Sequence, residues 1–203
     1  VPLTGPSGHI VRIMPGHTVT MNTNTRQAYR TIIQAGGRLD VNTTINHTLG
    51  QVSGQGTLAL QSSSVPSGNY DNFVATGTGT FEFGGNGSYT LPTNMATYNN
   101  LTITGGGTKT LPAGTTSYFI TTINQNLAIQ NGVTFELKKY TRLNLSGNLS
   151  MDDFSNIQVF QTWNYLDLKG TTPQYITGNF SNANKFFHVN MDNPSIVYIS
   201  GFF

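Results

Sequence analysis

Residues 76–111 read TGTGTFEFGGNGSYTLPTNMATYNNLTITGGGTKTL, a stretch in which short runs of β-type residues alternate with turns of glycine and asparagine. The runs are Thr80–Phe83, Tyr89–Leu91 and Leu101–Thr104. Glycine and asparagine tolerate the positive φ that a tight corner requires, so the stretch predicts strand, turn and strand again. We expect the whole chain to follow this scheme, because no convincing helix start or 3.6-residue apolar period lies between Gly8 and Ser200.

The composition is that of a folded, weakly charged all-β protein. Only 9% of the 203 residues are charged, against roughly 25% in an average domain. Solubility must therefore come from neutral hydroxyls and amides, which is typical of extracellular all-β proteins. Disordered chains are usually poor in aromatic residues and high in net charge, whereas this chain has 12 Phe, 9 Tyr and a net charge of +2.

Several partner classes are excluded by the same inventory. The chain has no cysteine, so disulfides, thiolate nucleophiles and zinc–sulfur sites are ruled out. Its basic residues are scattered apart from Lys138, Lys139 and Arg142, which argues against nucleic-acid binding. No apolar run approaches the ~20 residues that span a bilayer. Val1-Pro2-Leu3-Thr4 lacks a Met or a charged signal region, so we expect a processed product or a segment of a longer chain.

We predict a proline- and glycine-rich lead-in over residues 1–8 and one β domain over residues 9–203. Within it, short strand candidates follow one another between turns. They are His9–Ile13, Thr18–Met21, Thr31–Gln34, Arg38–Val41, Gly50–Val52, Thr57–Gln61, Asn72–Ala75, Thr80–Phe83, Ser88–Leu91, Asn100–Thr104, Thr108–Leu111, Tyr118–Ile123, Leu127–Gln130, Thr134–Leu137, Arg142–Leu145, Asn148–Met151, Ile157–Gln161, Tyr165–Leu168, Gln174–Ile176, Phe186–Met191 and Ile196–Ile199.

Two architectures fit these strands: a right-handed parallel β-solenoid and a β-sandwich. The pair Asn131-Gly132 could close a sandwich hairpin or form a solenoid corner. The solenoid is favoured because the strands are very short and because similar phrases recur without a strict period. At roughly 20–28 residues per turn the chain would make about eight coils. Phe81, Phe83, Leu101 and Ile103 would then be inward-facing, and Asn side chains would hydrogen-bond along the axis.

A solenoid has two open ends whose backbone groups need a cover. The chain ends on Phe202-Phe203, so we expect either a continuation of the natural chain or a partner over this end.

The repeated phrases carry a resemblance. They are SGQGTL at 53–58, VPSGNY at 65–70, GTFEF at 79–83, LP at 91–92, YNNLTI at 98–103, KTL at 109–111 and QYITG at 174–178. Together they resemble the repetitive regions of very large Bacteroidetes cell-surface proteins, which include gliding-motility adhesins. The resemblance implies type IX export, assembly at the cell surface and a β-solenoid stalk or adhesive module. Residues 138–168 depart from this phrasing and contain the only Trp.

Residues that could carry chemistry are few. Asp152-Asp153, the only adjacent acidic pair, is expected in a solvated turn. The four histidines, His9, His17, His47 and His188, lack the spacing of a metal pair. We therefore expect no catalytic residue, no metal site and no cofactor. Trp163 and Tyr165, with Phe160, are the ligand-binding candidates because exposed aromatic rings stack on sugars and anchor interfaces; core packing is the alternative.

The sequence leaves three functional hypotheses open. The first is a non-enzymatic stalk or adhesin segment of an exported surface protein. Its partners would be neighbouring domains of the same chain, the export and surface-anchoring machinery, and surface polysaccharide. The second is a β-helical polysaccharide-active enzyme, which would need two carboxylates close together in a groove. The third is a sugar-binding module of sandwich type.

Overall fold

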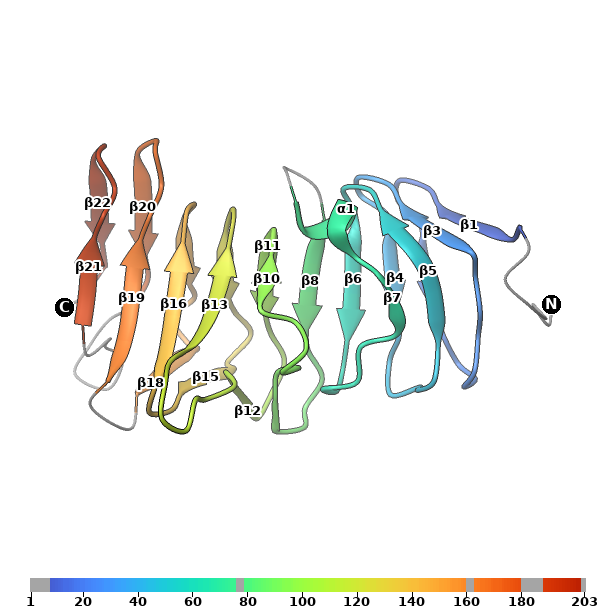
Figure 1. Ribbon diagram of the computed structural model, residues 1–203, viewed down its shortest axis with the longest axis horizontal. Coiled ribbons are helices and arrows are strands. Elements are labelled where there is room, and N and C mark those ends of the chain that lie inside the picture. The colour runs from blue at the N-terminus through green and yellow to red at the C-terminus, as the bar shows by residue number, and fades with distance from the viewer. Residues whose placement is uncertain (1–7, 76–78, 160–162, 180–187, 202–203) are drawn as a thin grey trace.

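The strands of this protein stack in parallel along one axis, as the computed structural model shows for residues 8–75, 79–159, 163–179 and 188–201 (Figure 1). One nine-stranded sheet, here called the spine sheet, runs the whole length of the stack. Because its neighbouring strands pair in parallel, the β-solenoid prediction is confirmed and the β-sandwich alternative is wrong. The spine strands are β2 (Thr18–Thr20), β4 (Arg38–Asp40), β6 (Thr57–Leu60), β8 (Thr80–Phe83), β11 (Asn100–Ile103), β14 (Leu127–Ile129), β17 (Leu149–Met151), β20 (Gln174–Thr177) and β22 (Val197–Ser200).

Three shorter sheets close the coils against the spine sheet. The N-terminal sheet contains β1 (Ile10–Ile13), β3 (Arg30–Ile33), β5 (Thr48–Ser53) and β7 (Ser67–Asn69). The C-terminal sheet contains β10 (Thr97–Tyr98), β13 (Phe119–Ile123), β16 (Thr141–Leu145), β19 (Asn164–Leu168) and β21 (His188–Met191). The third sheet contains β9 (Tyr89–Thr90), β12 (Thr108–Thr110), β15 (Thr134–Leu137) and β18 (Asn156–Val159). The first coils are therefore two-sided and the middle coils three-sided.

The coils differ in length, as the irregular phrasing predicted. Successive partners in the spine sheet lie 19 residues apart between Arg38 and Thr57, and 27 residues apart between Leu149 and Ile176. The nine spine strands give about eight turns. Loop length varies while strand register is kept, because the register is fixed by the inward-facing side chains.

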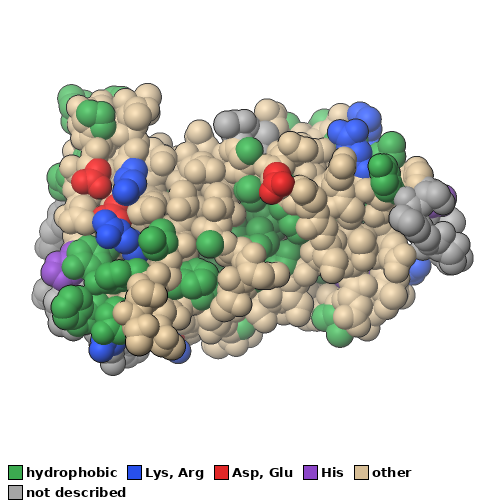
Figure 2. All heavy atoms as spheres, viewed as in Figure 1, with side chains coloured by type: hydrophobic (Ala, Val, Ile, Leu, Met, Phe, Trp, Pro, Cys, Tyr) green, Lys and Arg blue, Asp and Glu red, His purple; other side chains and the backbone are tan. Residues whose placement is uncertain are grey.

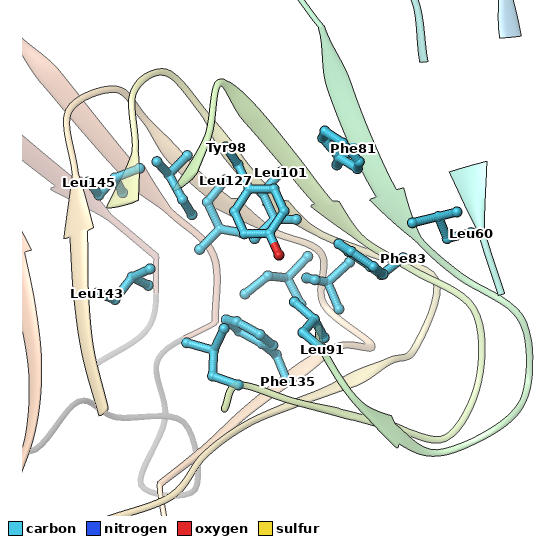
Figure 3. Packing of buried hydrophobic residues seen from close by; sticks show 14 of the residues in the cluster. Leu60, Phe81, Phe83, Leu91, Tyr98, Leu101, Leu127, Phe135, Leu143 and Leu145 are labelled. Atoms are coloured by element: carbon cyan, nitrogen blue, oxygen red, sulfur yellow. The ribbon is translucent and has the colours of Figure 1, made fainter. Parts of the chain in front are cut away.

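An apolar ladder fills the interior (Figure 3). Leu58, Phe81, Leu101 and Leu127 are aligned in successive spine strands and are fully buried. Phe83 and Ile103 are buried as well, so all four inward-facing residues predicted from the sequence are confirmed. At the two ends of the described stack the ladder is more exposed: Val19 in β2 is 43% exposed and Ile199 in β22 is 41% exposed.

Asparagine side chains hydrogen-bond along the axis, as predicted. The backbone N–H of Asn126 donates to Asn100 Oδ1 at 3.2 Å, and that of Asn148 donates to Asn126 Oδ1 at 2.9 Å. Asn148 Oδ1 in turn accepts from the backbone N–H of Tyr175 at 2.8 Å. Each asparagine side-chain oxygen thus accepts a hydrogen bond from a backbone N–H of the next coil. These side-chain bonds add to the backbone hydrogen bonds between coils.

The strand predicted over Asn72–Ala75 is wrong: Asp71–Val74 form a single helical turn, α1. Tyr70, Phe73 and Val74 have the i, i+3, i+4 spacing of a helical face, and Phe73 is fully buried. A Cβ on Gly79 would lie 2.4 Å from the Phe73 ring, so only glycine fits there. Strands β7 and β10 were also missed, because Ser67–Asn69 carries little β propensity and Thr97–Tyr98 is only two residues long.

Two further sequence features take defined places. Asn131-Gly132 forms a solenoid corner between β14 and β15, not a hairpin, because these strands belong to different sheets. The lead-in predicted over residues 1–8, the end at Phe202-Phe203 and the aromatic Phe160 fall almost wholly outside the described residues. In the segments that are described, no helix is long and apolar enough to cross a membrane.

Candidate binding face

The outer surface of the C-terminal sheet carries two parallel columns of side chains. Alternate residues of a strand face outward, so aligned strands place their outward residues in rows along the axis. One row contains Ile120, Arg142, Tyr165 and His188. The neighbouring row contains Thr97, Thr122, Asn144, Asp167 and Asn190. We call them the ring row and the polar row.

A third column lies at the corner where the strands begin. Tyr118, Tyr140 and Trp163 each precede the first residue of an aligned strand, β13, β16 or β19. The rings of Tyr118 and Tyr140 meet edge to face with centroids 5.8 Å apart, and Tyr140 and Trp163 are 6.3 Å apart. Successive coils therefore bring three aromatic residues, far apart in sequence, into one column.

This corner column joins the ring row into one surface, the aromatic face: Tyr118, Tyr140, Trp163, Tyr165, His188 and Ile120. Tyr118 packs edge to face on Tyr165 with centroids 5.3 Å apart. The rings of Tyr165 and His188 are stacked at 4.6 Å. Hydrophobic side chains gather with a histidine and with basic side chains where Figure 1 places β13, β16, β19 and β21 (Figure 2).

The aromatic face is exposed to solvent. Trp163 is 48% exposed and Ile120 is 47% exposed, while Tyr118, Tyr140 and Tyr165 are half-buried. Trp163 therefore lies on the surface, and core packing does not account for it. The structure brings both sequence candidates, Trp163 and Tyr165, into one patch and adds Tyr118, Tyr140 and His188. Residues of the patch recur in the sequence at intervals of 22 or 23, close to the length of one coil. This interval was the sequence signal that could have identified them.

The corner column includes two aromatic residues in left-handed backbone conformation. Tyr140 has φ of 59° and Trp163 has φ of 83°. Asparagine, which tolerates this region, occupies three other left-handed positions, Asn42, Asn46 and Asn131. A bulky residue there costs on the order of 1–3 kcal/mol, and such strain clusters at functional sites. Folding alone would favour Asn or Gly at these corners.

Charged groups beneath the aromatic face are paired. Arg142 Nε and Nη2 both donate to the fully buried Asp167 carboxylate. This hydrogen bonding raises the pKa of Arg142. Asn190 Nδ2 donates to Asp167 Oδ1 at 2.6 Å. The Arg142 guanidinium lies 5.4 Å from the Tyr165 ring centroid, and Lys139 Nζ lies 4.7 Å from that of Tyr140, so both cations also contact rings.

The other candidate residues are dispersed and have structural roles. Asp152 Oδ1 accepts hydrogen bonds from the backbone N–H groups of Phe154 and Ser155, and its Oδ2 accepts one from Asn131. Burial alone would raise the pKa of Asp152, but these bonds and the Ser155 side chain outweigh it and lower the pKa. His47 is buried and accepts from the Arg26 backbone N–H at 3.1 Å.

Metal-ligating side chains are not grouped either. Over the described ranges, no three His, Asp or Glu side chains come together in a way that could hold a metal ion. His9 and His17 lie exposed near the first coil, and His188 belongs to the aromatic face.

Two acidic residues share the outer face of the spine sheet. Asp40 and Glu82 flank Ala59 in register, which places them roughly 10 Å apart. Arg38 donates to both Glu82 oxygens, at 2.8 and 2.7 Å, so that carboxylate is occupied. Three cavities, of about 230, 330 and 390 Å³, have no Asp or Glu in their lining.

No protein-family model, no curated protein and no solved structure matches this chain.

Proposed function

We propose that this chain is a non-enzymatic adhesive and structural module of a large exported cell-surface protein. The aromatic face carries the proposal: it is an exposed aromatic patch mounted on a continuous parallel ladder. Exposed Tyr and Trp beside Arg are the residues that most often anchor binding partners. The solenoid would hold this face away from its attachment point, outside the cell.

The phrases behind the Bacteroidetes resemblance support a scaffold, because their residues hold coils together. In YNNLTI, Tyr98, Leu101 and Ile103 are buried and Asn100 belongs to the axial ladder. In KTL, Lys109 is fully buried and its Nζ donates to the carbonyl oxygens of Gly85, Gly87 and Gly106, at 3.1, 2.8 and 2.6 Å. This lysine joins two neighbouring glycine corners and is enclosed by protein.

The solenoid form suits transmission of force along the chain. Each coil is joined to the next by parallel strand pairs in several sheets and by a shared apolar interior. Such coils contact only their nearest neighbours, so load passes from one to the next. The partners we propose are neighbouring domains of the same chain, the export and surface-anchoring machinery, and surface polysaccharide.

The polysaccharide-active enzyme is the alternative that most needs testing. Most glycoside hydrolases use two carboxylates flanking the scissile bond, and the cavities described above have no acidic lining. The chain should be incubated with soluble polysaccharides and the reducing ends measured over time. We expect no release above that of heat-denatured protein; sustained release would overturn the non-enzymatic assignment.

Adhesion is tested by coating beads with the chain and measuring their retention under flow on glass, polystyrene and polysaccharide films. Retention on at least one surface should fall in Tyr140→Ala/Trp163→Ala. The matched control is Tyr29→Ala/Phe154→Ala, which removes two exposed aromatic residues elsewhere. Equal retention of both variants on every surface would overturn the adhesive role of the aromatic face.

A further inference from the structure

We infer that the aromatic face binds one extended chain of a neutral, β-linked polysaccharide, laid along the solenoid axis. The inference rests on the proposed adhesive function and names the ligand class of the same surface. Tyr140 and Trp163 would stack on the sugar rings, the stacked rings of Tyr165 and His188 would present their edges beside them, and the polar row would bind the sugar hydroxyl groups.

The surface has the linear shape of a polymer-binding strip. The ring row and the polar row run side by side over β13, β16, β19 and β21, with one residue of each row per coil. The repeat is the strand spacing of ~4.8 Å. One pyranose unit of an extended β-linked chain covers a similar length, so successive sugars can meet equivalent positions on successive coils. A strip of this kind fits a linear polymer better than a globular protein.

The chemistry of the two rows matches that of a sugar chain. A pyranose ring presents apolar C–H faces and hydroxyl edges. Exposed Trp163 and Ile120 provide apolar surface for the faces. The half-exposed Thr122 and Asn190 provide polar groups for the edges, whereas Asn144 Oδ1 is buried. The surface is amphipathic across its width and repetitive along its length, as a polysaccharide chain is.

Two cations at the aromatic face have carboxylate partners, while a third, Lys139, lies over the Tyr140 ring. Arg142 is bound by the buried Asp167 carboxylate. Lys138 Nζ lies 3.7 Å from the carboxylate of Glu136, a residue of β15 in the third sheet. With Arg142 and Lys138 paired, the surface keeps little free positive charge beyond Lys139 with which to select an acidic polymer. Stacking and hydrogen bonding remain, and both favour a neutral glycan.

The binding test uses the intrinsic fluorescence of Trp163, the only tryptophan of the chain. The full chain is titrated with cello-oligosaccharides and chito-oligosaccharides of increasing length, and with maltohexaose as the α-linked control. We expect a saturable change in Trp163 emission with at least one β-linked series. Affinity should rise with length up to about four sugars, one for each coil of the strip.

The second part of the test measures how substitutions and salt change binding. Binding is measured as depletion of the chain from solution by insoluble cellulose and chitin. Tyr140→Ala should weaken binding about tenfold, as expected for loss of an aromatic anchor. Tyr29→Ala/Phe154→Ala should bind like the unmodified chain, and far-UV circular dichroism verifies that each variant folds. Binding should persist at about 0.5 M salt, where exposed charges are screened.

The outcomes separate the inference from the proposed function. If the chain binds only alginate, an acidic polysaccharide, and this binding is lost at high salt, the inference of a neutral glycan is wrong. If beads are retained on polystyrene through the aromatic face but the chain binds no glycan, the glycan inference is wrong and the adhesive role stands. No retention and no binding on any surface would overturn both.

Discussion

The backbone N–H of Tyr140 donates a hydrogen bond to the carbonyl oxygen of Trp163, 3.1 Å away, and both residues adopt the left-handed conformation. The corner thus repeats in two successive coils with an aromatic residue where asparagine or glycine would fold more easily. The hydrogen bond fixes the height of one ring relative to the other, and their centroids are 6.3 Å apart. Aromatic residues here cost stability, which favours a role for their rings at the surface.

The backbone of Trp163 can be tested by comparing two substitutions that remove the same ring. Trp163→Asn should be more stable than Trp163→Ala by about 1 kcal/mol, because asparagine tolerates the left-handed region and alanine does not. Urea denaturation followed by circular dichroism gives the free energy of unfolding. Equal stability of the two variants would mean that residue 163 is not left-handed in solution.

Ile103 tests the inward-facing ladder. Ile103→Asp should lower the free energy of unfolding by several kcal/mol, because it places an unpaired charge at a fully buried position. Ser150→Asp is the matched control, since Ser150 is on the exposed face of β17. A melting temperature of Ile103→Asp close to that of the control would contradict the register of the spine sheet.

Lys109 tests whether the buried ammonium supports the glycine corners. Burial lowers the pKa of Lys109, yet its three carbonyl acceptors hold it in place. Lys109→Met should destabilise the fold by about 1–3 kcal/mol, because those carbonyls lose their donor. The exposed Lys169→Met should change stability little. If both variants unfold at the same urea concentration, Lys109 contributes no net stability.

The adjacent acids Asp152 and Asp153 differ in role. Asp152→Asn should cost about 1 kcal/mol, because Asp152 caps the corner with its carboxylate, whereas exposed Asp153→Asn should be neutral. The pKa of Asp152 is lowered, so its contribution is present above about pH 3.9 and is lost as pH falls through the folded pKa. Urea denaturation near neutral and acidic pH measures this; equal pH dependence in the two variants would contradict it.

Three tyrosines predict loss of stability at alkaline pH. Burial raises the pKa of Tyr70, Tyr89 and Tyr98 above the unfolded value of about 10. The unfolded chain therefore releases these protons first, and the free energy of unfolding falls as pH rises above about 10. The lowered pKa of Lys109 has the opposite effect. It makes the free energy of unfolding rise with pH until the unfolded pKa of lysine is reached, near pH ~10.4.

The measurement is a series of urea denaturations from about pH 8 to about pH 11. Tyr98→Phe should reduce the slope of the free energy of unfolding against alkaline pH by the contribution of one proton. A free energy of unfolding that stays constant over this range would contradict burial of the three hydroxyl groups.

Short strands, glycine corners and alternating apolar residues were sufficient to predict the coils, the inward-facing residues and the axial asparagine ladder. Each of these depends on local pattern or on repetition, which a sequence displays. Helix α1 was missed because one turn around Phe73 is too short to show a period. Strands β7 and β10 were missed because they form only by pairing with a neighbouring coil.

The candidate site was only half visible in the sequence. Trp163 and Tyr165 were named for their ring chemistry, but Tyr118, Tyr140 and His188 are 22 or more residues away from their partners. The sequence alone determined an all-β chain of short strands with few reactive groups and favoured a parallel β-solenoid, because strand length, turn residues and apolar alternation are local properties. Only the tertiary structure decided that five rings share one face, because coil length and register set which residues of successive turns become neighbours.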